Sequence, residues 1–397
     1  MMGESDRRYM RRALALARKG LGLASPNPTV GCFIVRDGQV VGQGLHEYSG
    51  LDHAEVRALQ QAGGRARGST VYVTLEPCCC QGRTPPCAER LMKAGIRRAV
   101  VAAIDPNPLV SGRGISALRS SGIQVDLGLL ENDSLALIEP FACSISTGLP
   151  LVVAKAGLSL DGRIATRLKK ARWITSEEGR EFGQQLRLQL DALVVGVGTV
   201  LADDPQLSYR GRLPKARPLI KAVLDSWLRT PTGASIVKTA RTSPVILFCR
   251  QDAPVSRRRA LEARGAEVIA VPHGKGGLDL PSVIGELGRR SVRGILVEGG
   301  GAVHWSFLSS GLVDKFYFIV APLVLGGQNA VPAVGGRGYD TVGEALRFRI
   351  RRNWRAGPDF VFEAYPSNSR SILSPWRLCS GIPPSVERGT ARSSRRR

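Results

Sequence analysis

The stretch from His53 to Cys87 constrains this chain more than any other part of its sequence. His53 offers an imidazole, and Cys78 and Cys87 offer two thiols. Three protein ligands of these types leave the fourth position of a tetrahedral Zn²⁺ open, as in catalytic rather than structural zinc sites. A water bound at such an ion ionises near neutral pH. We therefore predict one catalytic zinc ion per chain, held by His53, Cys78 and Cys87.

Glu55 follows His53 by two residues and is the candidate proton carrier. In zinc-dependent base deaminases, a glutamate that is not a metal ligand moves protons between the water and the ring. The alternative is a buried histidine beside two core thiols. That arrangement rarely combines catalytic-zinc spacing with a carboxylate next to the histidine. The sequence thus predicts Glu55 as a catalytic residue.

The pattern of apolar residues around this stretch predicts alternating strands and helices. Residues 7–19 show helical spacing, and two strands meet at the turn signal Asp37-Gly38. A helix is expected to open near His53, a strand to span 70–75, and a second helix to begin at Cys87. A thiolate at a helix N-terminus is favoured by the helix dipole. We expect a three-layer α/β domain with helices on both faces of the sheet.

The net charge of +23 raises the question of an anionic partner. Residues 366–397 hold part of this charge and are rich in Ser, Pro and Arg, so we expect a disordered basic tail. A diffuse positive field also suits a phosphorylated small molecule. The charged N-terminus and the lack of a long apolar run indicate a cytoplasmic protein without membrane contact. The eight cysteines fit a reducing compartment.

The first half of the chain resembles the RibD family, the bifunctional deaminase and reductase proteins of riboflavin biosynthesis. Eight residues separate Cys78 from Cys87, whereas other zinc base deaminases usually have two between their cysteines. Inside this loop, Cys79-Cys80-Gln81 replaces the Ser-His-His that is usual in the family. The resemblance rests on Pro26-Asn27-Pro28, Val30-Gly31, His53-Ala54-Glu55, Thr74 to Cys78, Gly82 to Cys87, Asp105 to Pro108 and Gly112-Arg113-Gly114.

The second half resembles the reductase part of the same family, whose fold is similar to dihydrofolate reductase. We expect a deaminase domain at 1–147, in a cytidine-deaminase-like fold, and a reductase domain at 148–365, with the boundary near 144–150. The matching stretches are Lys155, Ser159 to Ala165, Trp173 to Thr175, Leu186-Arg187, Asp191-Ala192, Gly196 to Pro205, Leu207, Arg210, Asp225-Ser226 and Glu298 to Gly300.

The resemblance implies an NADPH site and a substrate site in this second half. Glycine turns at strand ends let backbone N–H groups approach a pyrophosphate, although each turn alone is a weak signal. Arg187 and Arg210 would meet a substrate phosphate, while Leu207 and Glu298 would contact the rest of the substrate. Read without the family, Arg187 is a solvated charge on a helix surface. The cofactor residues implied are Gly157, Trp173, Thr199, Asp203, Ser226, Gly300, Gly301, Ala302, Val303, His304, Trp305 and Ser306.

The leading hypothesis is zinc-dependent deamination of a phosphorylated diaminopyrimidine ribosyl compound, followed by NADPH reduction of its ribosyl group to ribityl. One alternative is a reductase alone, with the deaminase impaired by Cys79-Cys80-Gln81. Another is an RNA-binding zinc deaminase that uses the basic tail, which leaves the second half without a role and lacks base-stacking aromatics. We expect no nucleic-acid partner, and a homo-oligomer. Two further departures from the family are Ala171 and the bulky Trp305 at a cofactor turn.

Overall fold

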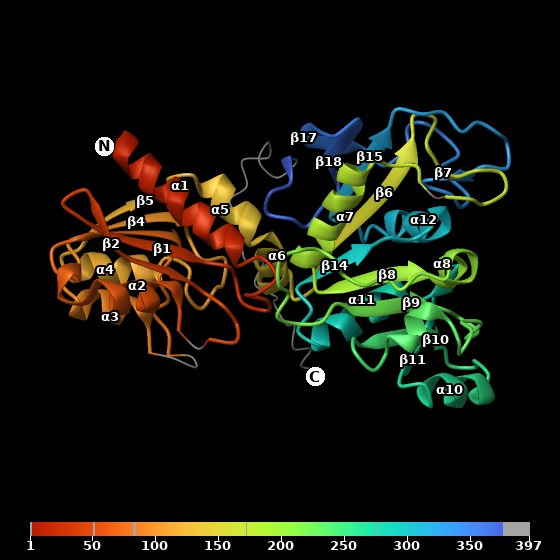
Figure 1. Ribbon diagram of the computed structural model, residues 1–397, viewed down its shortest axis with the longest axis horizontal. Coiled ribbons are helices and arrows are strands. Elements are labelled where there is room, and N and C mark those ends of the chain that lie inside the picture. Colours follow the sequence, from red (N-terminus) through yellow and green to blue (C-terminus); the bar gives the residue numbers. More distant parts are fainter. Residues whose placement is uncertain (1, 51, 82–84, 172, 275, 376–397) are drawn as a thin grey trace, which may run out of the picture.

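The chain forms two α/β domains that lie side by side along the long axis of the computed structural model (Figure 1). The structure describes residues 2–375 except 51, 82–84, 172 and 275. The expected features at 82–84 and 376–397 therefore lie outside the described residues. Helix α6 (Glu139–Thr147) lies between the domains, and strand β6 (Leu151–Ser159) follows it.

The first domain is built on a five-stranded sheet in the order β2-β1-β3-β4-β5. Strands β1 and β2 form the expected antiparallel hairpin around Asp37-Gly38, whereas β3, β4 and β5 run parallel. Its elements before α6 are α1 (Glu4–Lys19), β1 (Gly31–Arg36), β2 (Gln39–Leu45), α2 (Ala54–Ala62), the 3-10 helix η1 (Gly63–Ala66), β3 (Thr70–Leu75), α3 (Cys87–Lys93), β4 (Arg98–Ala103), α4 (Arg113–Ser120), β5 (Gln124–Leu127) and α5 (Glu131–Leu137).

Helices cover both faces of this sheet, as the alternation of elements predicts. On one face, Met10 and Leu14 of α1 pack with Phe33 and Tyr72 of the strands. On the other face, small and apolar residues of α2, α3 and α4 pack against the opposite sides of the same strands. Because neighbouring residues of a strand point to opposite faces, a run of buried residues such as β3 serves both layers.

The second domain contains a nine-stranded sheet in the order β11-β10-β9-β8-β14-β6-β15-β18-β17. The strands from β11 to β15 are parallel, and β18 and β17 add an antiparallel edge. The remaining elements are β7 (Arg163–Ala165), α7 (Glu177–Gln189), β8 (Ala192–Gly196), α8 (Val197–Asp203), β9 (Ile220–Leu224), α9 (Ser235–Lys238), β10 (Val245–Arg250), α10 (Val255–Glu262), β11 (Glu267–Val271), β12 (His273–Gly274), β13 (Gly277–Leu278), α11 (Leu280–Arg289), β14 (Gly294–Val297), α12 (Gly301–Ser309), β15 (Lys315–Ala321), β16 (Val331–Pro332), β17 (Phe348–Ala356) and β18 (Asp359–Pro366).

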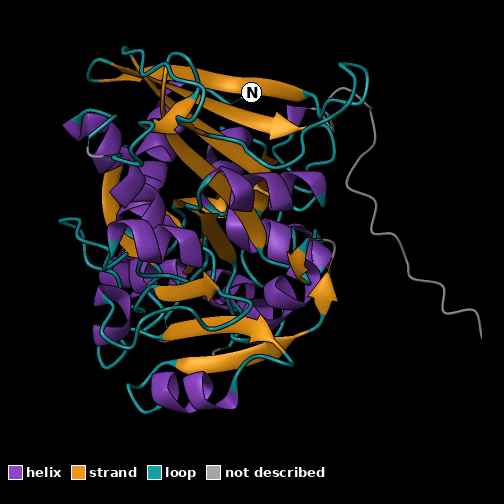
Figure 2. Cartoon of the chain, turned by 90° about the vertical axis from the view of Figure 1, so that its right-hand side faces the viewer, coloured by secondary structure: helices purple, strands orange, loops and turns teal. Residues whose placement is uncertain are grey.

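Two apolar layers enclose the second sheet. Residues of α7, α8, α9 and α10 pack on one face, and residues of α11 and α12 pack on the other. The strands and the helices of both layers are seen from the side in Figure 2. None of the helices in the described part of the chain is both long and apolar enough to cross a membrane.

A buried ionic cluster joins the two domains. The ammonium group of Lys315 on β15 pairs with Glu139 of α6 and, at 3.1 Å, with Glu363 of β18. The Tyr365 hydroxyl donates to the Glu139 carboxylate at 3.0 Å. Although burial alone would lower the pKa of Lys315, the surrounding carboxylates and tyrosines raise it well above its usual value. The cluster therefore stays charged and links the last helix of the first domain to the second sheet.

Residues 366–397 were expected to form a disordered tail. The first residues after β18 instead contact the folded domains. Ser371 donates to Glu139 at 2.5 Å, Leu373 is buried, and Arg370 pairs with Asp314 at 2.6 Å. The sequence suggested disorder because the segment is polar and lacks an apolar period. Ser371 and Arg370 instead donate hydrogen bonds to the buried carboxylates of Glu139 and Asp314. The rest of the expected tail lies outside the described residues.

We expect Lys315→Met to lower the free energy of unfolding by about 3 to 5 kcal/mol, because it leaves buried carboxylates without their shared cation. Urea denaturation of the variant and the wild type measures the difference. Arg337→Met removes one side of an exposed ion pair, with side chains 81% and 69% exposed, and serves as the control. That control should cost less than about 1 kcal/mol. Equal stability of Lys315→Met and the wild type would contradict the importance of the cluster.

Candidate metal centre and cofactor site

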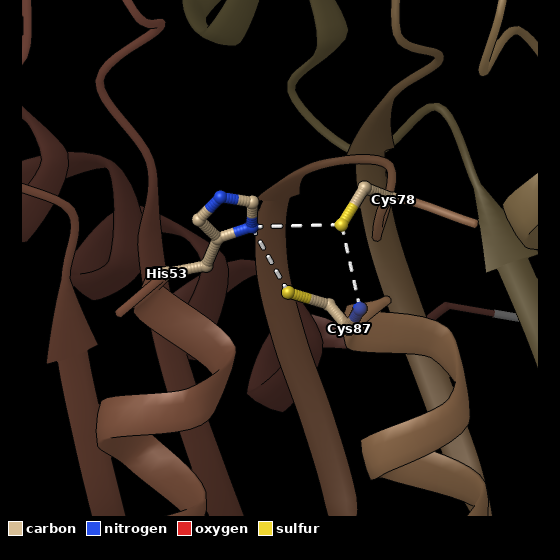
Figure 3. Close-up of side chains that lie close together, drawn as sticks. All are labelled: His53, Cys78 and Cys87. Atoms are coloured by element: carbon tan, nitrogen blue, oxygen red, sulfur yellow. Dashed lines mark hydrogen bonds between the residues drawn. The ribbon is translucent and has the colours of Figure 1, made fainter. Parts of the chain in front are cut away.

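The three predicted zinc ligands come together at one end of the first sheet (Figure 3). His53 caps the N-terminus of α2, Cys78 follows β3, and Cys87 begins α3. The Nδ1 atom of His53 lies 3.1 Å from the sulfur of Cys87 and 3.5 Å from that of Cys78. All three ligand atoms lie within 4.8 Å of one another. Residues distant in sequence thus form one compact donor set.

This donor set fits a tetrahedral zinc ion. Usual Zn–N and Zn–S bond lengths place neighbouring ligand atoms about 3.5 to 3.8 Å apart. The two distances from the imidazole nitrogen, 3.1 and 3.5 Å, are close to that spacing. One nitrogen and two sulfur ligands leave a fourth position for water or substrate. In the described residues, this is the only group of three or more such side chains that could hold a metal.

The ionisation of the two cysteines differs from the expectation that the α3 dipole favours a Cys87 thiolate. Without metal, hydrogen bonds from Cys87 and from His53 lower the pKa of Cys78 to about 4. The backbone N–H of Cys87, at the start of α3, donates to the Cys78 sulfur at 3.3 Å. The neighbouring Cys78 thiolate and burial raise the pKa of Cys87. The helix terminus therefore stabilises negative charge on Cys78 rather than on its own residue.

Glu55 lies in the first turn of α2, as predicted, and is 3% exposed. Burial, and to a smaller extent the charge of Cys78, raises the pKa of Glu55 to about 7. A carboxyl group that titrates near neutral pH can accept and return a proton under the same conditions. The position and the burial of Glu55 suit the role of a proton carrier beside the metal ligands.

The unusual Cys79-Cys80-Gln81 sequence directly follows Cys78. The Cys80 thiol is exposed and donates to the Leu109 carbonyl at 3.0 Å, while the sulfurs of Cys79 and Cys80 lie 3.8 Å apart. The loop that follows, Gly82 to Thr84, lies outside the described residues. Of the three consecutive cysteines, Cys78 is the one whose sulfur lies with His53 and Cys87 in the candidate ligand set.

Sequence reasoning missed two features of this site. His46 is buried beside His53, with ring centres 5.2 Å apart, and its Nε2 atom lies 3.1 Å from the Asn27 amide nitrogen. Glu76 is buried and accepts backbone hydrogen bonds from the segment after β4. Asn27 and Glu76 belong to the motifs shared with the family, and this was the sequence signal that could have identified them as residues of the site. His46 lies outside those motifs, so the sequence offered no comparable signal for it.

In the second domain, the predicted cofactor residues gather at the carboxyl ends of neighbouring parallel strands. Ser226 follows β9, Thr199 and Asp203 lie in α8 after β8, and Gly300 follows β14. Gly157 lies near the carboxyl end of the adjacent strand β6. Because β9, β8, β14 and β6 are consecutive in the sheet, these residues share one edge. Open α/β sheets bind ligands at this edge.

Each of the two glycine turns precedes the first turn of a helix, where free backbone N–H groups can bind an anion. Gly196 and Gly300 cap α8 and α12, and neither helix start receives a side-chain cap. Free N–H groups at a helix N-terminus favour a phosphate. A Cβ atom added to Gly300 or Gly198 would meet nothing within 4 Å, whereas one added to Gly196 would lie 2.7 Å from the Val303 side chain and one added to Gly301 would lie 2.5 Å from the Pro332 carbonyl oxygen. The open space at these helix starts therefore lies beside Gly198 and Gly300. These features fit a dinucleotide pyrophosphate, which NADPH would supply.

The Arg187 side chain is 12% exposed and paired, and it is therefore not the solvated helix-surface charge suggested by the sequence without the family. Its guanidinium donates to Glu298 at 2.6 and 3.2 Å and to the Ser208 carbonyl at 3.0 Å. Burial alone would raise the pKa of Glu298, but Lys155 and Arg187 outweigh it and lower the value to about 2. The result is a buried carboxylate held between two cations.

The predicted substrate residues Leu207 and Arg210 lie near α7, and the predicted cofactor residue Trp173 lies just before that helix. Leu207 is buried with a positive φ of 53°, and the Arg210 backbone N–H donates to Gln184 of α7 at 2.9 Å. The segment that carries them therefore lies along α7, next to Arg187. Trp173 lies between β7 and α7, 65% exposed, with the Arg180 guanidinium over its ring.

The residues of α12 that depart from the family pattern face neighbouring chain rather than open space. Trp305 contacts the ring of Tyr339 at 5.1 Å, and His304 is buried with its Nδ1 atom 2.8 Å from the Ala333 carbonyl. Ala302, Val303 and Ser306 belong to the same helix. Trp305 thus packs against the 336–339 segment, which accommodates its bulk beside the cofactor turn.

Comparison with known families defines the class of each domain. Residues 3–103 match the cytidine and deoxycytidylate deaminase zinc-binding region, and residues 150–362 match the RibD C-terminal domain. The expected fold class is confirmed: a cytidine-deaminase-like domain precedes a dihydrofolate-reductase-like domain. The molecule is therefore a two-domain protein that combines a zinc-type deaminase domain with a RibD-type reductase domain.

Whole-chain relatives show the particular family. The riboflavin biosynthesis protein RibD of Actinobacillus pleuropneumoniae is 38% identical, with 90% of this chain and 95% of the relative covered. RibD of Escherichia coli is 38% identical, with 89% and 97% covered. A solved RibD of Acinetobacter baumannii is 36% identical with a TM-score of 0.81, covering 91% of this chain and 99% of the other. The chain belongs to the RibD family.

A second solved relative has a more explicit description. It is a diaminohydroxyphosphoribosylaminopyrimidine deaminase/5-amino-6-(5-phosphoribosylamino)uracil reductase from Thermotoga maritima. It is 31% identical to this chain with a TM-score of 0.79, and the match covers 91% of this chain and 99% of that one. The likeness spans both domains.

We expect Cys78→Ser to reduce the zinc affinity at least tenfold, because the variant lacks a ligand whose ionised sulfur faces His53. Cys80→Ser should retain about one zinc per chain, since the Cys80 thiol faces Leu109 instead. Zinc per chain, measured by mass spectrometry after dialysis against a competing chelator, separates the two outcomes. Loss of zinc from Cys80→Ser would show that the triple cysteine shares the role of ligand.

We expect the ionised Glu298 to stabilise the folded protein, so that protonation of Glu298 in acid lowers the free energy of unfolding. Its pKa is lowered to about 2 in the folded chain, so its contribution is present above pH 4.5 and is lost as the pH falls towards 2. The full contribution is about 3 kcal/mol, and Glu298→Gln should therefore flatten this part of the stability profile. Urea denaturation at several pH values measures it, with the exposed Glu344→Gln as control. An unchanged profile in Glu298→Gln would contradict the assignment.

Proposed function

We propose that this protein carries out two consecutive steps of riboflavin biosynthesis. The first domain would deaminate 2,5-diamino-6-ribosylamino-4(3H)-pyrimidinone 5′-phosphate, and the second would reduce the ribosyl group of the product to ribityl. The observation that carries the proposal is the compact His53, Cys78 and Cys87 set with buried Glu55 beside it. The family relationship over both domains supports the second step.

In the deaminase step, His53, Cys78 and Cys87 would hold the zinc ion. When bound, the metal would make a water available as a nucleophile near neutral pH. Glu55 would accept one proton from the attacking water on its carboxylate and pass it to the ring nitrogen. It would then take the second proton from the hydroxyl group added to the ring carbon and give it to the departing amine, which leaves as ammonia. Burial suits Glu55 to this task, because it raises the pKa of the carboxyl group to about 7.

In the reductase step, NADPH would supply the hydride when bound. The α12 N-terminus at Gly300 and Gly301 would hold its pyrophosphate, with the other predicted cofactor residues along the same sheet edge. Arg210 and Arg187 would bind the substrate phosphate. Three of the five N–H donors of Arg187 are used in the hydrogen bonds to Glu298 and Ser208, so two remain. Glu298 would bind the ribose-derived hydroxyl groups.

The proposal assigns residues 1–147 to the deaminase domain and 148–365 to the reductase domain. It also includes a cytoplasmic location, which accords with the free state of the cysteines in the described residues. Homo-oligomerisation stays a prediction. The impaired-deaminase alternative is not favoured, because the three candidate ligands lie together despite the Cys79-Cys80-Gln81 sequence.

Ammonia release from the diaminopyrimidine ribosyl phosphate by zinc-loaded protein tests the order of the two steps. We expect release without NADPH, and NADPH oxidation when the cofactor is then added. Absence of ammonia, together with NADPH oxidation on predeaminated substrate, would instead identify a reductase alone.

Glu55→Gln tests the proton carrier. The variant should keep about one zinc per chain and the reductase activity, while the rate of ammonia release falls by a factor of about 10² to 10⁴, as for the loss of a general acid–base group. Metal analysis and the two separate assays measure these properties on one preparation. Ammonia release at the wild-type rate would exclude Glu55 from the role.

A further inference from the structure

Glu76 is a buried carboxylate that neither proposed reaction uses. It is 3% exposed and lies between the end of β3 and the metal ligand Cys78. Its Oε2 atom accepts from the backbone N–H groups of Asp105 at 3.1 Å and Gly112 at 2.9 Å. Its Oε1 atom accepts from those of Gly114 at 2.9 Å and Ile115 at 3.2 Å. One side chain thus holds both ends of a single segment.

The segment held by Glu76, residues 105–115, connects β4 to the first turn of α4. It lies beside the metal-binding loop because β3 and β4 are parallel neighbours. A Cβ atom on Gly114 would lie 2.0 Å from the Pro77 carbonyl oxygen, so the two backbones are in direct contact. The Cys80 thiol donates to Leu109 at 3.0 Å, which adds a second contact. The segment therefore forms a wall next to Cys78.

Two apolar side chains at this wall are unusually exposed. Leu109 is 64% exposed in the middle of the segment, and Ile104, just before it, is 37% exposed. Binding pockets for small molecules are lined mainly by apolar side chains with a few polar groups. Exposed apolar groups on and just before the segment that contacts Pro77 and Cys80 suit the face of a planar pyrimidine ring.

The carboxylate of Glu76 is well matched to the four backbone N–H groups that donate to it. Its two oxygens offer about four acceptor positions, and charge strengthens each hydrogen bond. A glutamine of the same size has one oxygen, and its amide nitrogen would face N–H donors. Glu76→Gln should therefore release one end of the segment while it conserves the volume of the side chain.

We propose that Glu76 is a positioning residue of the deaminase domain: it fixes residues 105–115 as the wall of the pyrimidine pocket and so determines substrate affinity. This inference rests on the proposed function. Glu76 touches neither the metal ligands' donor atoms nor the reacting atoms. Its effect should therefore appear in substrate binding rather than in zinc content.

Substrate binding in a Glu55→Gln background tests the inference without turnover. Calorimetry with the zinc-loaded protein and the diaminopyrimidine ribosyl phosphate gives the Kd. Adding Glu76→Gln should raise the Kd at least tenfold, with zinc near one per chain and reductase activity unchanged. Asp314→Asn, which alters another buried carboxylate that accepts backbone N–H groups, is the matched control and should leave the Kd unchanged.

Leu109→Ala provides a second test that does not depend on how Glu76→Gln folds. Leu109 is exposed, so its truncation should leave the fold intact and raise the Kd about fivefold by removing apolar contact with the ring. An unchanged Kd in Leu109→Ala, an unchanged Kd in folded Glu76→Gln, or a loss of zinc that parallels the loss of binding would overturn the inference. Absence of ammonia release from the wild-type protein would instead refute the proposed function.

Discussion

Parallel strand pairing determines where both candidate sites lie. In a parallel sheet, neighbouring strands end at the same edge, and the helices that follow begin there. In the first domain, the loop after β3 brings Cys78 to the start of α3, where Cys87 lies. In the second, the same rule places the Gly300 turn next to Thr199 and Gly157. The two candidate sites thus share one geometric arrangement, in which helices begin at the sheet edge that carries the candidate residues.

The sequence predicted those parts of the structure that depend on local pattern or on motif residues. The hairpin at Asp37-Gly38, the helix opening at His53 and the helix beginning at Cys87 all appear where their signals stand. The grouping of the zinc ligands also followed from their residue types. Such features could be predicted because each depends on neighbours within a few residues or on chemistry that few residue sets allow.

Features that depend on partners far along the chain escaped prediction. Glu76 looks like any acidic residue near a strand end until the segment 105–115 returns to it. Arg187 has the spacing of a surface residue, yet the fold covers most of its side chain and pairs it with Glu298, which follows β14. The polar segment after β18 looks disordered, yet Arg370 meets the buried Asp314. In each case, a charged residue is stabilised by a partner whose proximity only the tertiary fold creates.

The ionic cluster at the domain junction also bears on the order in which the chain can assemble during synthesis. Glu139 leaves the ribosome with the first domain, whereas Lys315 and Glu363 follow much later, and Ser371 later still. Until those residues emerge, Glu139 has none of its buried partners. The deaminase half of the nascent chain can therefore form its own sheet early, but full docking of α6 against the reductase sheet must wait until Ser371 has been synthesised.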